Sequence, residues 1–282
     1  MDYSQILSQQ FNIKEEYAKN IITLLDDGNT IPFIARYRKE MHGSMDDQLI
    51  REFAEKLEYL RGLDKRRDEI RSLIDAQEKL TDEINLALDK AATLSELEDI
   101  YRPYRPKRKT RASIAKEKGL EPLANDILKQ EKGFDPSKSA VDYIDEEKGV
   151  TSVEDAIQGA MDIIAELVSD NAEIRKRIRN LTNANGVLVS VATDEEKDSV
   201  YKNYYDYKEP VKKIAGHRVL AVNRGEKEGF LKVSVETDSE KPLNSIFRAM
   251  ITDKNQLCSD IIREACTDAY QRLISPSIER EV

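Results

Sequence analysis

Residues with special chemistry are scarce in this sequence of 282 residues, which has no tryptophan and only two cysteines and two histidines. Cys258 and Cys266 are eight residues apart in a helical pattern. Because each helical residue advances about 1.5 Å, they would lie about 12 Å apart along the axis, too far for a disulfide within one helix. The scattered cysteines and histidines also lack zinc-site spacing. We therefore expect both cysteines to be structural, and we expect no bound metal and no cofactor.

Long apolar runs are absent as well. No stretch approaches the roughly 20 apolar residues that cross a bilayer. The first residues lack a basic region followed by an apolar core, which a secretory signal would need. We expect a cytoplasmic protein with no membrane partner.

Recognisable catalytic motifs are also missing. Residues 224–229 (RGEKEG) match neither a P-loop nor a dinucleotide fingerprint, and no HExxH pattern occurs. No known motif places a serine or cysteine nucleophile beside His217 and Arg218. The sequence predicts a protein that is not an enzyme, with neither catalytic residues nor metal ligands.

Apolar residues recur mostly at helical spacing, and glycine (11) and proline (8) are sparse. Long helices are predicted over 44–75 and 242–275, where they would brace other parts of the molecule. β-Branched runs at 187–192 and 230–235 predict two strands. The expected fold class is mainly α, a multi-helix scaffold with a helix-turn-helix-like unit, long bracing helices and a small β element.

Short helices separated by tight breaks are predicted over roughly 80–130, with capping signals at Thr81 and Ser95. This arrangement suits a helix-turn-helix-like unit, although the pattern does not distinguish it from another small helical bundle. We predict three parts, namely 1–75 with the N-terminal helices and a long helix, 76–130 with the helix-turn-helix-like unit and a basic loop, and 131–282 with a helical domain and a small two-stranded element.

Charge is unevenly distributed along the chain. The net charge is −9, with 45 basic and 54 acidic residues. The residues from Tyr101 to Lys118, here called the basic segment, include eight basic residues and a single acid, Glu117. This local charge of +7 leaves the remainder of the chain strongly acidic. One basic segment on an acidic body is the pattern expected of a protein that binds a polyanion.

The basic segment provides the candidate binding site. Its cations would neutralise phosphates, its tyrosines would stack on unpaired bases, and Pro103 and Pro106 would stiffen the loop. The alternative is that the segment pairs with acids of its own chain, such as Glu96, Glu98 and Asp99. The candidate nucleic-acid-binding residues are Tyr101, Arg102, Tyr104, Arg105, Lys107, Arg108, Lys109, Arg111 and Lys116.

Three other groups have a structural interpretation that we favour over a ligand-binding one. Arg36 and Arg38 follow an apolar helix face, and an interdomain salt bridge is the favoured role. The cations of 175–179 are predicted near a helix C-terminus, where they meet the helix dipole favourably. The four tyrosines within 201–207 are predicted to pack against neighbouring helices.

Two long strings resemble signature sequences of the bacterial Tex family of transcription accessory proteins, residues 31–40 (IPFIARYRKE) and 97–112 (LEDIYRPYRPKRKTRA). The resemblance covers the whole chain in the right order. Shorter strings that also resemble the family lie at 205–207, 209–210, 217–218, 224–229 and 276–282.

The resemblance implies a region that precedes an RNase H-like domain, a helix-hairpin-helix unit and a C-terminal OB-fold RNA-binding domain. It also implies association with transcription and nucleic acid, and a likeness to the core of a eukaryotic transcription elongation factor. A new helix is predicted to begin near Pro276, so we expect the natural chain to continue past Val282.

Two functions are compatible with these features. The first is a nucleic-acid-binding module that contacts RNA or DNA phosphates non-specifically, because no base-reading helix stands out. The second is a protein-docking scaffold, in which the helices 44–75 and 242–275 position the downstream domains and the basic segment meets the transcription machinery.

Overall fold

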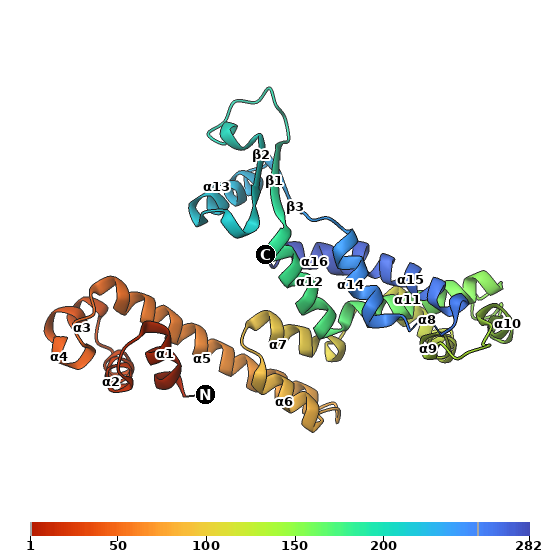
Figure 1. Cartoon of the computed structure of the whole chain (residues 1–282), viewed down its shortest axis with the longest axis horizontal. Coiled ribbons are helices and arrows are strands. Elements are labelled where there is room, and N and C mark those ends of the chain that lie inside the picture. The colour runs from red at the N-terminus through yellow and green to blue at the C-terminus, as the bar shows by residue number, and fades with distance from the viewer. Residues whose placement is uncertain (1, 253) are drawn as a thin grey trace. The chain divides into compact units, whose positions relative to one another are not determined.

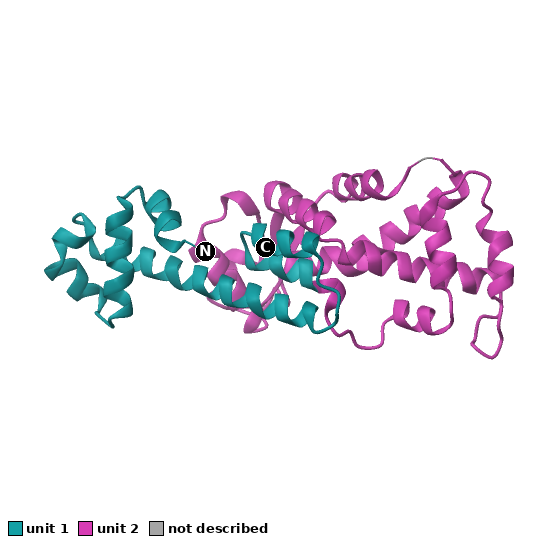
Figure 2. Cartoon of the chain, turned by 90° about the horizontal axis from the view of Figure 1, so that it is seen from below, with its two compact units in different colours: residues 1–101 teal, residues 102–282 magenta. Residues whose placement is uncertain are grey.

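The computed structural model describes residues 2–252 and 254–282. The chain forms two compact units, residues 1–101 (unit 1) and 102–282 (unit 2), coloured teal and magenta in Figure 2. Both units are mainly helical, as the sequence predicted. None of the described helices is both long and apolar enough to cross a membrane. The unit boundary falls inside the predicted middle part, 76–130, and the three-part division stays a prediction.

Unit 1 has one apolar core near its N-terminus. Leu7, Ile21, Ile34 and Phe53 are fully buried in this core. The helices of unit 1, labelled in Figure 1, are α1 (Tyr3–Phe11), α2 (Glu15–Asp26), α3 (Ile31–Tyr37), α4 (Lys39–His42), α5 (Asp47–Asp75), α6 (Asp82–Lys90) and α7 (Leu94–Tyr101).

The long helix α5 confirms the prediction for residues 44–75. Asp46 caps its N-terminus by accepting a hydrogen bond from the amide of Leu49 at 2.8 Å. Arg67 interrupts the apolar face and is nevertheless buried. Its guanidinium donates to the carbonyls of Leu88 (2.8 Å) and Ala91 (2.9 Å) at the C-terminal end of α6. Carbonyls at a helix C-terminus carry partial negative charge, so they accept a buried cation favourably.

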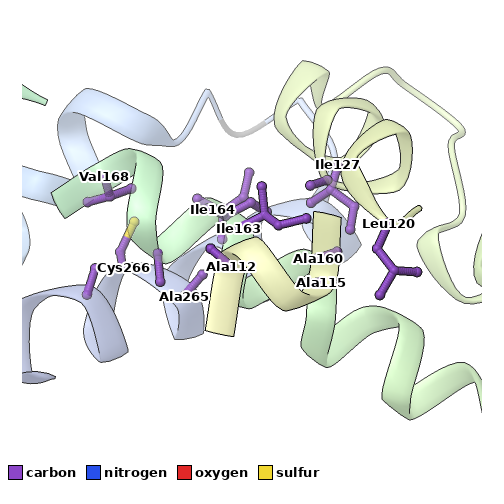
Figure 3. Close-up of a cluster of buried hydrophobic side chains, with 14 of the residues drawn as sticks. Ala112, Ala115, Leu120, Ile127, Ala160, Ile163, Ile164, Val168, Ala265 and Cys266 are labelled. Atoms are coloured by element: carbon purple, nitrogen blue, oxygen red, sulfur yellow. The ribbon is translucent and has the colours of Figure 1, made fainter. Parts of the chain in front are cut away.

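Unit 2 is built around one long helix, α11. Its apolar residues Ala160, Ile163, Ile164 and Val168 lie in a buried cluster that α8, α9 and α15 complete (Figure 3). Cys266 belongs to the same cluster, and Cys258 is also buried, as predicted. The α-helices of unit 2 are α8 (Arg111–Glu117), α9 (Glu121–Lys129), α10 (Pro136–Ala140), α11 (Val153–Asp170), α12 (Ala172–Asn185), α13 (Gly216–Lys227), α14 (Glu240–Met250), α15 (Gln256–Asp268) and α16 (Ser275–Glu279). Its short 3₁₀ turns are η1 (Arg102–Tyr104), η2 (Val141–Tyr143), η3 (Lys202–Tyr204) and η4 (Val211–Lys213), and η5 (Ala269–Ile274) is a π-helix.

A small antiparallel sheet has the strand order β2-β1-β3 (Figure 1). Strands β1 (Val187–Ala192) and β3 (Leu231–Glu236) confirm the two predicted strands. The prediction of only two strands is wrong, because β2 (Asp206–Pro210) pairs with the other edge of β1. Ser190 lies opposite Tyr207 on one side and Val233 on the other.

The predicted helix over 242–275 is wrong as a single helix, because the chain breaks between α14 and α15. The backbone of Ile251 is extended, and Asn255 caps α15 by accepting from the amide of Cys258 at 3.3 Å. The buried side chain of Gln130 fixes this break. It donates to the carbonyl of Met250 and accepts from the amide of Thr252, each at 2.9 Å. The helix predicted near Pro276 corresponds to α16.

Candidate nucleic-acid interface

The basic segment folds as a short turn, a loop and a helix. Arg102–Tyr104 form the 3₁₀ turn η1, where Pro103 fixes one backbone angle. Thr110 then starts α8 through a capping box. Its hydroxyl accepts from the amide of Ser113 at 3.0 Å, while the Ser113 hydroxyl accepts from the amide of Thr110 at 2.8 Å. The loop 105–109 is therefore held between two ordered elements.

Helix α8 lies close against α11 because small residues line their contact. Ala112 and Ala115 are buried on the inner face of α8 (Figure 3). On the α11 side, a Cβ placed on Gly159 would lie 2.3 Å from Cδ1 of Leu120 and 3.4 Å from the Cβ of Ala115. This close packing fixes α8, and with it one end of the loop, to the core of unit 2.

An acidic stripe on α11 lies beside the basic segment. Asp162, Glu166 and Asp170 are spaced four residues apart, so they share one helix face. Lys107 forms ion pairs with Glu166, at 3.5 Å, and with Asp170. The Nε of Arg102 lies 3.4 Å from the other oxygen of Asp170. Asp170 is the last residue of α11, where a carboxylate meets the helix dipole unfavourably and nearby cations offset the cost.

Asp162 is the least satisfied member of the acidic stripe. Its Oδ1 is buried and has no hydrogen-bond partner among the described residues. Burial raises the pKa of Asp162, and the charge of Asp268 adds to the rise, while the charges of Arg111 and Arg272 oppose it. The positive charge of Arg111, in the basic segment, thus stabilises the ionised form of the Asp162 carboxyl group.

The remaining candidate cations are exposed to solvent. Lys109 lies 3.5 Å from Glu117, and Lys116 lies 2.9 Å from Glu121; both pairs are on the surface, where such pairs contribute little. Among the described residues, Arg105 and Arg108 have no ion-pair partner. Arg102 and Lys107 therefore pair with the chain's own acids, while Arg105 and Arg108 have no such partner among the described residues.

The sequence analysis named the neighbouring Glu98 as a possible partner of the basic segment, and its ion pair with Arg66 lies within unit 1. Glu98 instead accepts a hydrogen bond from Nε of Arg66 at 2.6 Å, and Asp99 is buried. Tyr101 is also a core residue, with 5% of its surface exposed and the Arg66 guanidinium 5.7 Å from its ring centre. We therefore remove Tyr101 from the candidate set. Tyr104 is half-buried.

Helices α8 and α9 are joined by a tight turn in which Gly119 adopts a left-handed conformation, with φ of 83°. The exposed side of α9 carries Glu121 and Asn125, and Lys129 pairs with Asp126 at 2.7 Å. An acidic helix is poorly suited to enter a DNA groove. A DNA-reading helix-turn-helix here stays a prediction.

The prediction that the tyrosines pack against helices is confirmed for Tyr201, whose Cδ1 would lie 3.0 Å from a Cβ placed on Gly225 of α13. Tyr201 is buried, with its ring centre 5.8 Å from that of Phe230. The rings of Tyr204 and Tyr207 meet edge to face at 5.1 Å.

The interpretation of the cations at 175–179 as C-terminal dipole partners is wrong. Asn171 caps α12, so Arg175 lies in the first turns of the helix and far from its end at Asn185. Arg175 is fully buried and pairs with Glu281 at 2.6 Å.

Comparison with known proteins places these features in a family. The model of the Tex-like protein N-terminal domain matches residues 1–75, and the Tex central region-like model matches residues 131–282. The protein YdcI of Bacillus subtilis is 43% identical over 289 residues, covering all of this chain and 40% of the relative. The transcriptional accessory protein Tex of Neisseria gonorrhoeae is 39% identical over 238 residues, covering 84% of this chain and 31% of the relative.

A human relative is similar over nearly the whole chain. The S1 RNA-binding domain-containing protein 1 is 30% identical over 298 residues, covering 99% of this chain and 29% of the relative. The chain thus spans at most two fifths of the length of each of these relatives. Because the central-region model alone matches more than half of its residues, this chain belongs to the Tex family.

Proposed function

We propose that this chain is the nucleic-acid-binding module of a Tex-type transcription accessory protein, and that it contacts RNA or DNA phosphates without reading base sequence. The observation that carries the proposal is the exposure of Arg105 and Arg108, which lack acidic partners among the described residues. Lys109, Arg111 and Lys116 are exposed nearby in the sequence. Such cations attract phosphates and release counterions when they bind.

The acidic stripe gives the interface a fixed shape. Lys107 is held by Glu166 and Asp170, so the loop that carries Arg105 and Arg108 is tied to α11 before any ligand arrives. A loop that is already ordered loses less conformational entropy on binding. The carboxylates therefore position the free guanidinium groups.

The names of the relatives support this proposal. One is called a transcriptional accessory protein and another an S1 RNA-binding domain-containing protein. We extend a role in nucleic-acid binding to this chain, and we propose that it binds without catalysing a reaction. RNase H-like, helix-hairpin-helix and OB-fold domains would then act beside it in the longer protein. Nuclease turnover by the purified chain would contradict the non-catalytic part of this proposal.

The test compares two variants that each remove two exposed positive charges from unit 2. The first is Arg105→Gln with Arg108→Gln, and the matched control is Lys212→Gln with Lys213→Gln. Fluorescence anisotropy with single- and double-stranded RNA and DNA, across salt concentrations of about 50 to 200 mM, gives the affinity and its salt dependence.

We expect the arginine variant to weaken binding to every nucleic acid. The slope of log affinity against log salt should fall by roughly 0.7 to 0.9 for each lost phosphate contact, so by up to about 2. The lysine control should retain both the affinity and the slope. If the two variants bind nucleic acid with equal affinity and equal salt dependence, the basic segment is not part of the interface.

A protein-docking scaffold is the second candidate, and one observation favours it. Two cations of the basic segment, Lys109 and Lys116, already have carboxylate partners on the surface. An acidic surface of the transcription machinery would offer the same chemistry. The test is a pull-down of a transcription component from nuclease-treated extract. Docking would be supported over nucleic-acid binding if the arginine variant loses this pull-down while its nucleic-acid affinity is unchanged.

A further inference from the structure

Helix α3 of unit 1 exposes two aromatic rings on one face. Phe33 and Tyr37 are separated by one helical turn, with 37% and 67% of their surfaces exposed. Their ring centres are 5.4 Å apart and their planes are tilted by 40°. Exposed aromatic pairs are unusual on a protein surface, because burying a large ring is favourable. The two rings thus form a small platform open to solvent.

The platform rests on a fixed base. Ile34, between the two rings in sequence, is fully buried in the core of unit 1. The buried His42 of α4 places its Nε2 3.1 Å from the carbonyl oxygen of Ile34, which ties α4 to α3. Pro32 stands in the first turn of α3, where it favours the helical conformation. The rings are therefore displayed by an ordered part of the fold.

Three cations lie close to the two rings in the sequence. The Arg38 guanidinium carbon lies 5.8 Å from the centre of the Phe33 ring, and Arg36 and Lys39 are exposed. Among the described residues of unit 1, no carboxylate forms an ion pair with any of the three. The interdomain salt bridge favoured by the sequence analysis is not needed to explain them. We call Phe33, Tyr37 and these three cations the aromatic patch.

We propose that the aromatic patch is a second nucleic-acid contact, specific for single strands. Bases would stack on Phe33 and Tyr37, while Arg36, Arg38 and Lys39 would neutralise the adjoining phosphates. Aromatic rings beside cations are the recurring means of holding single strands without sequence preference. A duplex keeps its bases stacked inside, so the rings would gain nothing from it. An acidic protein segment would satisfy the cations and leave the rings without a flat partner.

This contact does not rest on the proposed function of the basic segment, because its residues lie in unit 1 and the basic cations lie in unit 2. The experiment is therefore done in the Arg105→Gln, Arg108→Gln background. The test variant is Tyr37→Leu, which keeps an apolar side chain and removes the ring. The matched control is Tyr59→Leu on α5, because Tyr59 is also exposed (41%) and has the Lys56 amine 4.8 Å from its ring centre.

Labelled oligouridine and a labelled RNA duplex of the same length are titrated into each protein. We expect Tyr37→Leu to weaken oligouridine binding at least about fivefold, the lower end of the effect of losing one base stack. Duplex affinity should not change, and Tyr59→Leu should bind both probes as its parent does. A second variant, Arg36→Gln with Arg38→Gln, should lower the salt dependence of oligouridine binding.

The result that would overturn the proposal is equal oligouridine affinity in Tyr37→Leu and Tyr59→Leu. The proposal would also be overturned if the protein captures polyglutamate through the patch cations while every patch variant leaves oligouridine binding unchanged. That result would assign the patch to an acidic protein. Tyr37 is mostly exposed, so both tyrosine variants should retain the thermal midpoint of the parent, which circular dichroism measures.

Discussion

Arg175 and Glu281 form an ion pair that joins helix α12 to the last residues of the described chain. Their Nη2 and Oε1 atoms are 2.6 Å apart, and the Arg175 side chain has no exposed surface. The other carboxylate oxygen accepts from Nη2 of Arg179, also at 2.6 Å, and Ser277 donates its hydroxyl to Oε1 at 3.0 Å. One carboxylate thus pairs with two guanidinium groups.

Substituting Glu281 by alanine should destabilise unit 2. Loss of the carboxylate removes a charge partner of the buried Arg175, and breaking a buried pair costs about 3–5 kcal/mol. A quarter of the Glu281 side chain is exposed, so we expect a loss of about 2–3 kcal/mol. Urea unfolding followed by circular dichroism measures the change. Arg280→Ala, at the neighbouring exposed position, should leave the unfolding free energy unchanged.

The same carboxylate should make stability depend on pH. Burial raises the pKa of Glu281, but the hydrogen bond from Arg179 and the charges of Arg175 and Arg179 outweigh it and hold the pKa below 4.5. A depressed folded-state pKa means that the stabilisation is complete above the unfolded-state pKa and is lost as the pH falls through the folded value. The unfolding free energy of the natural chain should therefore decline below about pH 4.5.

Other carboxylates also contribute to the loss of stability at low pH. The informative quantity is therefore the difference in unfolding free energy between the natural chain and Glu281→Gln. That difference should be largest near neutral pH and shrink as the pH falls below about 4.5. Urea titrations at several pH values supply it. A difference that stays constant down to about pH 3 would show that Glu281 does not titrate between the folded and unfolded states.

Gly159→Ala and Gly62→Ala should change stability in opposite directions. At Gly159 the new methyl group meets the buried Leu120 at 2.3 Å, and overpacking of this kind typically costs about 1–3 kcal/mol, part of which the better helix propensity of alanine offsets. At Gly62 on α5, nothing lies within 4 Å, so alanine should stabilise by about 0.5–1 kcal/mol. Thermal unfolding of the two variants distinguishes these signs. A stabilised Gly159→Ala would mean that α8 shifts away from α11 without cost.

Asp170→Asn should strengthen nucleic-acid binding. Its carboxylate competes with phosphates for Lys107 and Arg102, and the amide removes that competition, while Glu166 still pairs with Lys107 and keeps the loop tied to α11. We expect affinity to rise about threefold or more at low salt, with a steeper salt dependence as further phosphates are contacted. Anisotropy titrations provide both values. A fall in affinity would show instead that holding Lys107 in place matters more than freeing it.

Local signals identified most of the helices before the structure was considered. Thr81 caps α6 as predicted, whereas the capping signal predicted at Ser95 is wrong, because α7 begins at Leu94 and the Thr93 hydroxyl accepts from the amide of Glu96 at 3.2 Å. Strand β2 was missed because Asp206–Pro210 is polar and ends in proline. It forms because β1 offers an unpaired edge, and that edge is a tertiary feature.

The break between α14 and α15 was equally hidden, since no glycine or proline lies between Met250 and Gln256. Gln130 fixes it from 120 residues away, a distance that no local pattern covers.

The sequence predicted where the basic residues of the candidate site lie, but not which acidic residues they pair with. The uneven distribution of charge located the basic segment, but the neighbouring Glu98 pairs with Arg66 of α5 instead. The spacing of Asp162, Glu166 and Asp170 marks one face of a helix, and only the folded chain shows that Lys107 lies against it. The exposure of Tyr37, which lies between Arg36 and Arg38, was not predicted for a similar reason, because only the folded chain shows which face of α3 is covered.

The ion pair at Glu281 has a consequence for the order in which a growing polypeptide matures. Unit 1 can complete its contacts once residue 101 has left the ribosome, as the bond from the Tyr3 hydroxyl to Asp64 illustrates. The pair between Arg175 and Glu281, by contrast, forms only after a further 106 residues have been synthesised. During translation the first unit is therefore ready to fold while the second still lacks this contact, and at that stage a chaperone would find more to protect in the second.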